Sequence, residues 1–344
     1  MKISTLTLIT LGLFSTSSYG AFEFDLGEGN KLKFGGYIKA DVRHISGEVP
    51  YRPFWIATGS TGEGASQTNF NMRESRFNAT YTHGKVSGFV EMDFYGSDGS
   101  EAVVNNYDPR LRHAFIKYEN WLVGQTWSTF MPLTAIPETL DFGGPHIGEA
   151  FIRQTQIRYT YGGFQFALEN PETTGADNKN DSIPDIVGRY IHKADWGEIG
   201  AAALVRQLDS DGIDKTTAAF NLYGKFLIGE KDDFRFQVNL GKSGRYVAPG
   251  LTTDITPDGD ISAAEETTAY YAAYRHFWSE DYRSTLFYGH AETDIQHKER
   301  QMWGINLIKQ ITPQLWAGVE VGNYEVTDAD ADSTYLQFSV KYAL

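Results

Sequence analysis

Apolar and polar residues alternate along most of this chain, from Lys31 to the C-terminus, in segments of about ten residues. The first such segment places Leu32, Phe34, Ile38, Ala40 and Val42 on one face and Lys33, Tyr37, Lys39, Asp41 and Arg43 on the other. A period of two residues is the pattern of a β-strand that has one apolar and one polar face. The chain is therefore predicted to be all-β.

The links between these segments alternate between short and long. Short links occur at residues 83–84 and 162–163, whereas residues 46–69, 96–109 and 247–265 form long polar links. Short turns that alternate with long loops are typical of up-and-down barrels in bacterial outer membranes. We expect a transmembrane antiparallel β-barrel of about sixteen strands, with an uncertainty of about two. A secreted sandwich or propeller would also alternate, but the chain shows no blade-length repeat.

The N-terminus has the three parts of a secretory signal peptide. Lys2 is basic, residues 6–14 are apolar, and Ser18 and Gly20 are the small residues before a predicted cleavage site. We therefore expect a signal peptide at residues 1–20 and a single barrel domain at residues 21–344. No later run reaches the roughly 18 apolar residues of a membrane-spanning helix.

Composition excludes several classes of function. The chain has no cysteine, which rules out disulfides and thiolate chemistry, and its net charge of −14 argues against nucleic-acid binding. No HExxH or GxSxG motif occurs, so we predict no enzyme and no cofactor. The acidic runs at residues 209–212 and 328–332 lack the spacing of an EF-hand, so no metal site is predicted.

The link at residues 128–150 is unusually apolar for a surface loop. Pro132, Pro137 and the pair Gly143-Gly144 give it a bent course. We expect this loop to fold into the lumen and pack against the wall, so that Glu138 and Asp141 project into the channel. A narrow passage is where facing charges select the solutes of a pore.

Basic residues on the polar faces of nearby strands would lie opposite these carboxylates. Arg112 shares a face with Arg110 in this interpretation, opposite Leu111 and Phe115. The candidate site therefore comprises the basic residues Lys39, Arg43, Arg76, Arg112 and Arg158 and the acidic residues Glu138 and Asp141. Guanidinium groups can hold carboxylates with two parallel hydrogen bonds, which favours passage of anions. The alternative is that the arginines only line a polar lumen.

Several motifs resemble those of the DcaP family of trimeric outer-membrane porins. They are residues 70–77 (FNMRESRF), 109–115 (PRLRHAF), 123–131 (VGQTWSTFM), 141–145 (DFGGP), 274–278 (YRHFW) and 283–284 (RS). The resemblance implies a sixteen-stranded homotrimer that admits dicarboxylates and other small organic anions past Arg76, Arg112 and Arg158. Two features depart from the family pattern: only residues 21–30 precede the first strand, and Leu344 replaces the usual final aromatic residue.

The sequence therefore predicts a porin in the outer membrane of a Gram-negative bacterium, surrounded by outer-membrane lipid. Its expected function is passive diffusion of small hydrophilic solutes, with a preference for organic anions such as dicarboxylates. Two alternatives stay open. The acidic loops would favour a non-specific or cation-preferring porin, and Trp55, Trp121 and Trp127 could stack sugars in an oligosaccharide channel.

Overall fold

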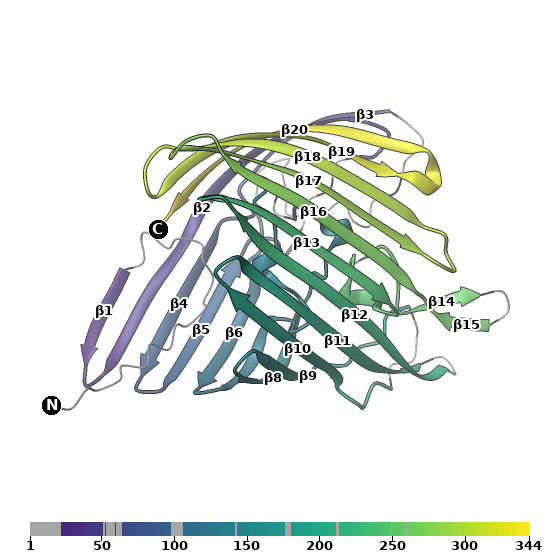
Figure 1. The fold of residues 1–344 in the computed structure, drawn as a ribbon, viewed down its shortest axis with the longest axis horizontal. Coiled ribbons are helices and arrows are strands. Elements are labelled where there is room, and N and C mark those ends of the chain that lie inside the picture. Colours follow the sequence, from purple (N-terminus) through teal and green to yellow (C-terminus); the bar gives the residue numbers. More distant parts are fainter. Residues whose placement is uncertain are drawn as a thin grey trace.

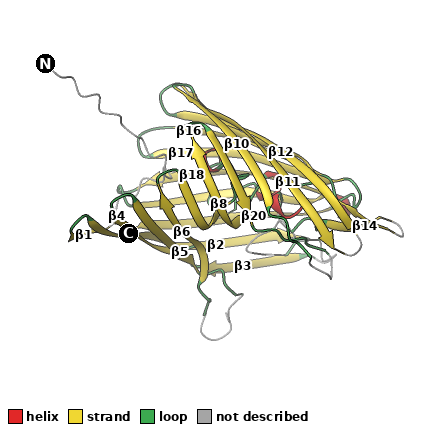
Figure 2. Ribbon diagram, turned by 90° about the horizontal axis from the view of Figure 1, so that it is seen from below, coloured by secondary structure: helices red, strands yellow, loops and turns green. Residues whose placement is uncertain are grey.

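A computed structural model describes residues 22–50, 52, 59, 64–97, 106–141, 143–175, 180–210, 213–248, 250–258 and 261–344. The predicted signal peptide and Trp55 lie outside these residues. Strands make up most of the described chain, together with single-turn 3-10 helices (Figure 2). None of the described residues forms a helix long and apolar enough to cross a membrane.

The strands form one large antiparallel sheet that closes on itself (Figure 1). Its first half contains β1 (Phe22–Gly27), β2 (Asn30–Gly47), β3 (Ala65–Asn71), β4 (Arg76–His83), β5 (Val86–Asp93), β6 (Arg110–Tyr118), β7 (Trp121–Trp127), β8 (Arg153–Tyr161) and β9 (Phe164–Glu169). Its second half contains β10 (Asp185–Ala194), β11 (Gly197–Ser210), β12 (Ile213–Ile228), β13 (Asp232–Gly241), β16 (Thr267–Phe277), β17 (Tyr282–Thr293), β18 (Glu299–Gln310), β19 (Leu315–Val326) and β20 (Ala331–Ala343).

Closure depends on β2, which pairs with strands from both ends of the chain. On one side it pairs with β20, where Lys39 lies opposite Lys341. On the other side β3 pairs with its second half and β4 with its first half, so these two strands form a single row. β1 pairs with residues 30–34 of β2 and continues the row of β20. The 18 strands of the sheet therefore form a barrel of sixteen rows, which confirms the predicted fold.

The two faces of the wall differ as the alternation predicts. On β12, Phe220 is 60% exposed whereas its neighbour Asn221 is 2% exposed. Large apolar side chains are exposed on the outer face of the other strands too, including Phe34, Ile116 and Leu336. In a barrel of this kind the outer apolar band faces lipid and the polar face lines the interior.

One prediction about the faces is wrong. The pairing of β5 with β6 shifts register between Glu91 and Met92, which lie opposite His113 and Leu111. The extra residue of such a bulge reverses the alternation beyond it. Phe115 therefore does not share the outer face with Leu111: its ring lies 5.3 Å from that of Phe89, while Ile116 is exposed on the outer face.

Three connections in the described chain carry structure of their own. Between β7 and β8 lie the 3-10 turns η1 (Leu133–Ala135) and η2 (His146–Gly148). Between β13 and β16 lie η3 (Gly244–Tyr246) and the hairpin of β14 (Ile255–Asp258) and β15 (Ile261–Ala264). The turn η4 (Thr327–Ala329) precedes β20. The first two connections meet at a bridge between Ala150 and Val247.

Candidate functional site

The first part of the link between β7 and β8, residues 128–141, contacts the polar faces of successive strands. Thr129 contacts β8 and β9, and the contacts then advance strand by strand around the wall to β2. In chain order they join Thr129 to Gln156 and Glu169, Met131 to Arg189, Thr134 to Glu198, Ile136 to Arg235, Glu138 to Arg275 and Arg283, Leu140 to Glu320, Gln337 and Lys39, and Asp141 to Arg43. The segment is thus fastened along most of its length.

Glu138 is held by two arginines from adjacent strands. The Arg283 Nε and Nη2 atoms donate to its two carboxylate oxygens at 2.8 and 2.7 Å, and Arg275 Nη1 donates at 3.0 Å. These two guanidinium groups lower the pKa of Glu138 to about 2, in spite of the burial that opposes ionisation. The carboxylate is therefore charged at neutral pH, and its charge is neutralised where it lies.

A second attachment lies at the far end of the segment. The Leu140 carbonyl accepts hydrogen bonds from Lys39 Nζ and Gln337 Nε2, both at 2.8 Å. Asp141 forms an ion pair with Arg43 at 2.6 Å. Like Glu138, Asp141 therefore meets its counter-ion within the protein.

The return part of the link, residues 143–150, packs on the second half of the barrel. Asn239 of β13 donates to the Gly148 carbonyl at 2.9 Å. A Cβ atom at Gly148 would lie 2.1 Å from the Tyr270 carbonyl oxygen, so only glycine permits this approach to β16. Burial raises the pKa of Glu149, whose side chain is 1% exposed.

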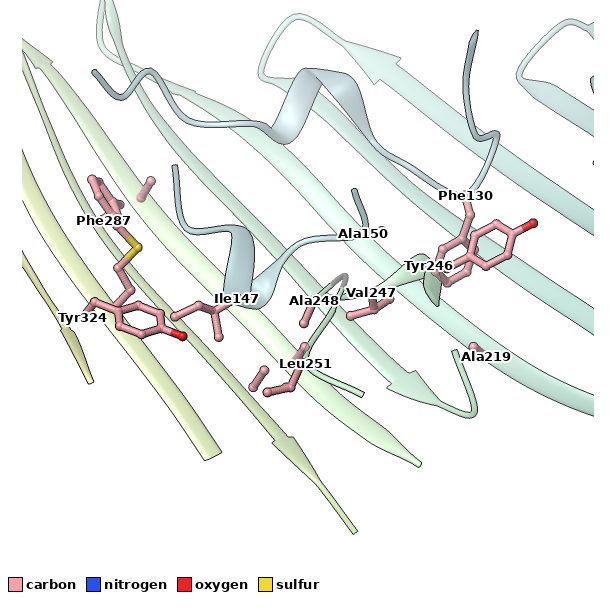
Figure 3. Packing of buried hydrophobic residues seen from close by; sticks show 14 of the residues in the cluster. Phe130, Ile147, Ala150, Ala219, Tyr246, Val247, Ala248, Leu251, Phe287 and Tyr324 are labelled. Carbon is pink, nitrogen blue, oxygen red and sulfur yellow. The ribbon is translucent and has the colours of Figure 1, made fainter. Parts of the chain in front are cut away.

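Apolar side chains of the β7–β8 and β13–β16 connections join in one buried cluster. Figure 3 shows Phe130 beside Tyr246, and Ile147 near Tyr324 and Phe287 of the wall. This cluster is the reason for the apolar character of residues 128–150, which would be unfavourable in a loop surrounded by water.

In the described chain, the arc of the wall from β4 to β8 is joined to the segment at its β8 end, where Thr129 contacts Gln156. Among the described residues, residues 128–150 make no hydrogen bond with β4, β5 or β6. The polar faces of β4–β8 carry the cations Arg76, Arg110, Arg112, Lys117 and Arg158, against the two carboxylates of Glu91 and Asp93. Cations therefore outnumber carboxylates along this arc.

The cations of the arc fall into two groups. Arg112 is buried and contacts Glu91 at 2.8 Å and Asp93 at 3.0 Å, while Arg110 contacts Asp93 at 2.7 Å. Arg76 lies 4.0 Å from Glu91 and above the ring of Tyr37. Lys117 and Arg158 lie in register on either side of Leu122, and within the described chain neither forms an ion pair.

The structure brings together only part of the predicted site. Lys39 and Arg43 meet the segment at Leu140 and Asp141, whereas Arg76 and Arg112 contact carboxylates of β5, and Arg158 lies apart from both acidic residues. Sequence reasoning assigned no role to Arg275 and Arg283, the partners of Glu138. Arg275 lies in the motif at residues 274–278 and Arg283 in the motif at residues 283–284, both of which resemble the DcaP family. That resemblance is the signal that could have identified them.

Residues 63–191 match the family model described as DcaP outer membrane protein. This match confirms the resemblance to the DcaP family. Among solved structures, the fold is similar to the outer membrane channel DcaP of Acinetobacter baumannii, with 23% identity, 93% of this chain and 99% of that chain covered, and a TM-score of 0.83. No curated protein matches the chain.

Porins with lower identity share the same fold. An anion-selective porin from Comamonas acidovorans has 12% identity and a TM-score of 0.61, with 92% of this chain and all of that chain covered. OmpF of Salmonella typhi has 12% identity and a TM-score of 0.60, with 93% of this chain and 100% of that chain covered. The DcaP-like chain thus has the fold of outer-membrane channels.

Proposed function

We propose that this protein is a porin through which small hydrophilic solutes diffuse passively, with a preference for small organic anions such as dicarboxylates. In this proposal it is exported with a cleaved signal peptide, resides in the outer membrane of a Gram-negative bacterium as a homotrimer, and is not an enzyme. The trimer and the dicarboxylates are supported by the resemblance to the DcaP family. The anion preference has support from the charges of the site itself.

The observation that carries the proposal is an asymmetry of unpaired charge. Glu138 and Asp141 are already neutralised by Arg275, Arg283 and Arg43. In the proposal, residues 128–150 narrow the lumen and solutes pass between this segment and the arc of β4–β8. A solute there meets an excess of cations, of which Lys117 and Arg158, both half-buried, form no ion pair in the described chain.

Acidic loops favour the alternative of a cation-preferring porin. The whole chain has a net charge of −14, and acidic residues such as Asp209, Asp328 and Asp332 lie near the ends of long strands. Salt screens such charges beyond about 8–10 Å, whereas charges that line a narrow passage act on the solute at close range. The charges of the arc should therefore dominate selectivity at physiological ionic strength.

The test is the reversal potential of single barrels or trimers in a planar bilayer under a salt gradient. The natural chain should prefer anions, and the pair of substitutions Lys117→Gln and Arg158→Gln should reduce the anion-to-cation permeability ratio several-fold. Arg76→Ala should reduce it as well. Lys85→Gln is the matched control, because Lys85 is exposed near a short turn and already paired with Glu119. A clear cation preference that none of these changes alters would refute the anion proposal.

A further inference from the structure

The outer face of the barrel has a hollow of about 490 Å³ over β17–β20. Apolar side chains line it almost throughout, among them Leu307, Val319 and Leu336, with the small residue Ser284 between larger neighbours. The surrounding wall presents exposed apolar side chains to lipid. A hollow in such a surface must be filled by lipid or protein, because water in an apolar hollow at membrane depth is unfavourable.

The hollow lies over an interruption of the strand pairing. Arg283 pairs with Ile308 and Leu286 with Ile305, but the residues between them have no register partners. The Thr285 N–H instead donates to the side-chain Oδ1 of Asn306 at 2.8 Å. The side-chain Nδ2 of the same Asn306 donates to the Glu138 carbonyl at 2.9 Å. The backbone pairing of the wall is therefore interrupted beneath the hollow, at Asn306, which also anchors the segment of the candidate site.

One end of the hollow has the composition of a membrane–water boundary. Trp278 and Tyr282 lie at the short turn between β16 and β17, and Trp278 Nε1 donates to Ser284 Oγ at 2.9 Å. Short turns of outer-membrane barrels lie on the periplasmic side, and tryptophan and tyrosine gather at the interface. This end of the hollow therefore opens toward the headgroups of the periplasmic leaflet.

A cation lies beside the same end. Lys309 is the register partner of Tyr282, is exposed on the outer face, and has its Nζ 5.3 Å from the centre of the Tyr282 ring. An ammonium group at the interface attracts the phosphate of a lipid headgroup. The apolar hollow therefore ends at a level of the wall where interfacial aromatic residues and a cation lie side by side, as the acyl chains of a phospholipid end at its polar headgroup.

We propose that this hollow is a binding site for one anionic phospholipid of the periplasmic leaflet. One acyl chain lies along Leu307, Val319 and Leu336, and the phosphate lies at Lys309. The bound chain covers the interruption between β17 and β18, and so supports the part of the wall that holds Asn306 and, through it, Glu138.

Native mass spectrometry of the full chain, purified in detergent and supplied with phosphatidylglycerol, tests the proposal. The natural protein should retain one phosphatidylglycerol molecule per barrel more tightly than any other bound lipid. Ser284→Leu should abolish this tight retention by filling the hollow, and Lys309→Gln should weaken it about fivefold, the effect of one interfacial cation. Ala201→Leu is the matched control at an exposed position outside the hollow, and Lys33→Gln is a second control at an exposed lysine of the polar face. Both variants should retain the lipid.

Other outcomes would overturn the proposal. If Ser284→Leu and Ala201→Leu retain equal amounts of phosphatidylglycerol, the hollow binds no lipid. If Ser284→Leu changes the oligomeric state and leaves lipid retention intact, the hollow is a contact between copies of the chain. Lys309→Gln is a surface change that should fold normally, so it decides the question even if the leucine variant is unstable.

Discussion

Glu138 shows how a single side chain can fix the position of a long connection. Its carboxylate accepts charged hydrogen bonds from Arg275 and Arg283, while its carbonyl accepts one from Asn306, so three strands hold one residue. Hydrogen bonds to charged groups contribute roughly 1.5–3 kcal/mol each, about twice the contribution of neutral ones. Position 138 should therefore control how rigidly the segment lies against the wall.

We expect Glu138→Gln to loosen this attachment. The amide has the size of the carboxylate but lacks its charge, so Arg283 loses its charged partner and Arg275 keeps only Asp233. Single-channel recordings should show greater open-channel noise at neutral pH. Glu280→Gln is the control, because Glu280 pairs with Lys231 at an exposed turn. Equal noise in the two variants would show that Glu138 does not restrain the segment.

The pH dependence of the segment's attachment follows from the pKa of the Glu138 carboxylate. The pKa of Glu138 is lowered to about 2, below the ordinary value of about 4.3 for glutamate. A lowered pKa means that the stabilisation is complete above the ordinary value and is lost as the pH falls through about 2. Acidification to pH 5 should therefore leave the natural channel as quiet as at neutral pH.

Which residues would face the interior could be predicted residue by residue, but their partners could not. Alternation alone places Lys39, Arg43 and Arg76 on the polar face, and the structure agrees. The partner of each cation depends on the path of residues 128–141 around the wall, and no local pattern encodes that path. For this reason Arg275 and Arg283 received no role, although their own strands were recognisable.

Among the elements, β3 and β4 form one row with a break at residues 72–75. Ser75 fills the break: its Oγ accepts from the Lys39 N–H at 3.0 Å and donates to the Lys39 carbonyl at 3.2 Å. The hydroxyl thereby replaces the backbone partners that a continuous strand would supply. Glu74, in the same break, contacts Tyr37 and Lys39 of β2.

Ser75→Ala should destabilise the barrel at this break. The substitution leaves the Lys39 N–H and carbonyl buried without these partners, at a cost of about 1–3 kcal/mol. The temperature at which the folded band converts to the unfolded band on unboiled gels should fall. Ser87→Ala is the matched control, because Ser87 lies on the polar face of β5 and makes no side-chain hydrogen bond in the described chain. Equal conversion temperatures would contradict this role of Ser75.

Bulges and breaks mark the limit of prediction for elements. Alternation predicted most of the strands and their number, because the period of two persists along each segment, but β3 (Ala65–Asn71) lies largely within the link predicted at residues 46–69. A single extra residue opposite Glu91 reverses that period, which is why Phe115 was assigned to the wrong face. The break at residues 72–75 was likewise invisible, because the polar residues Arg73, Glu74 and Ser75 read as part of a strand.

For the whole molecule, closure of the ring determines how it resists denaturation. β20 and β2 pair over residues 37–47, so no long strand edge of the wall is left open there. In lipid each backbone polar group needs a partner within the protein, which a closed ring provides. Unfolding must therefore open many backbone hydrogen bonds together, and the folded barrel should persist in SDS until it is heated.

This persistence makes the proposed trimer testable on a gel. Unboiled samples should migrate as an SDS-resistant oligomer, and boiling should convert them to one band of the monomer. A single heat-modifiable monomer band without boiling would contradict the trimer yet agree with a closed barrel, because each barrel closes through its own β2 and β20. A protein that stays soluble without detergent and leaves lipid vesicles sealed would instead contradict the membrane barrel, since its exposed apolar wall requires lipid.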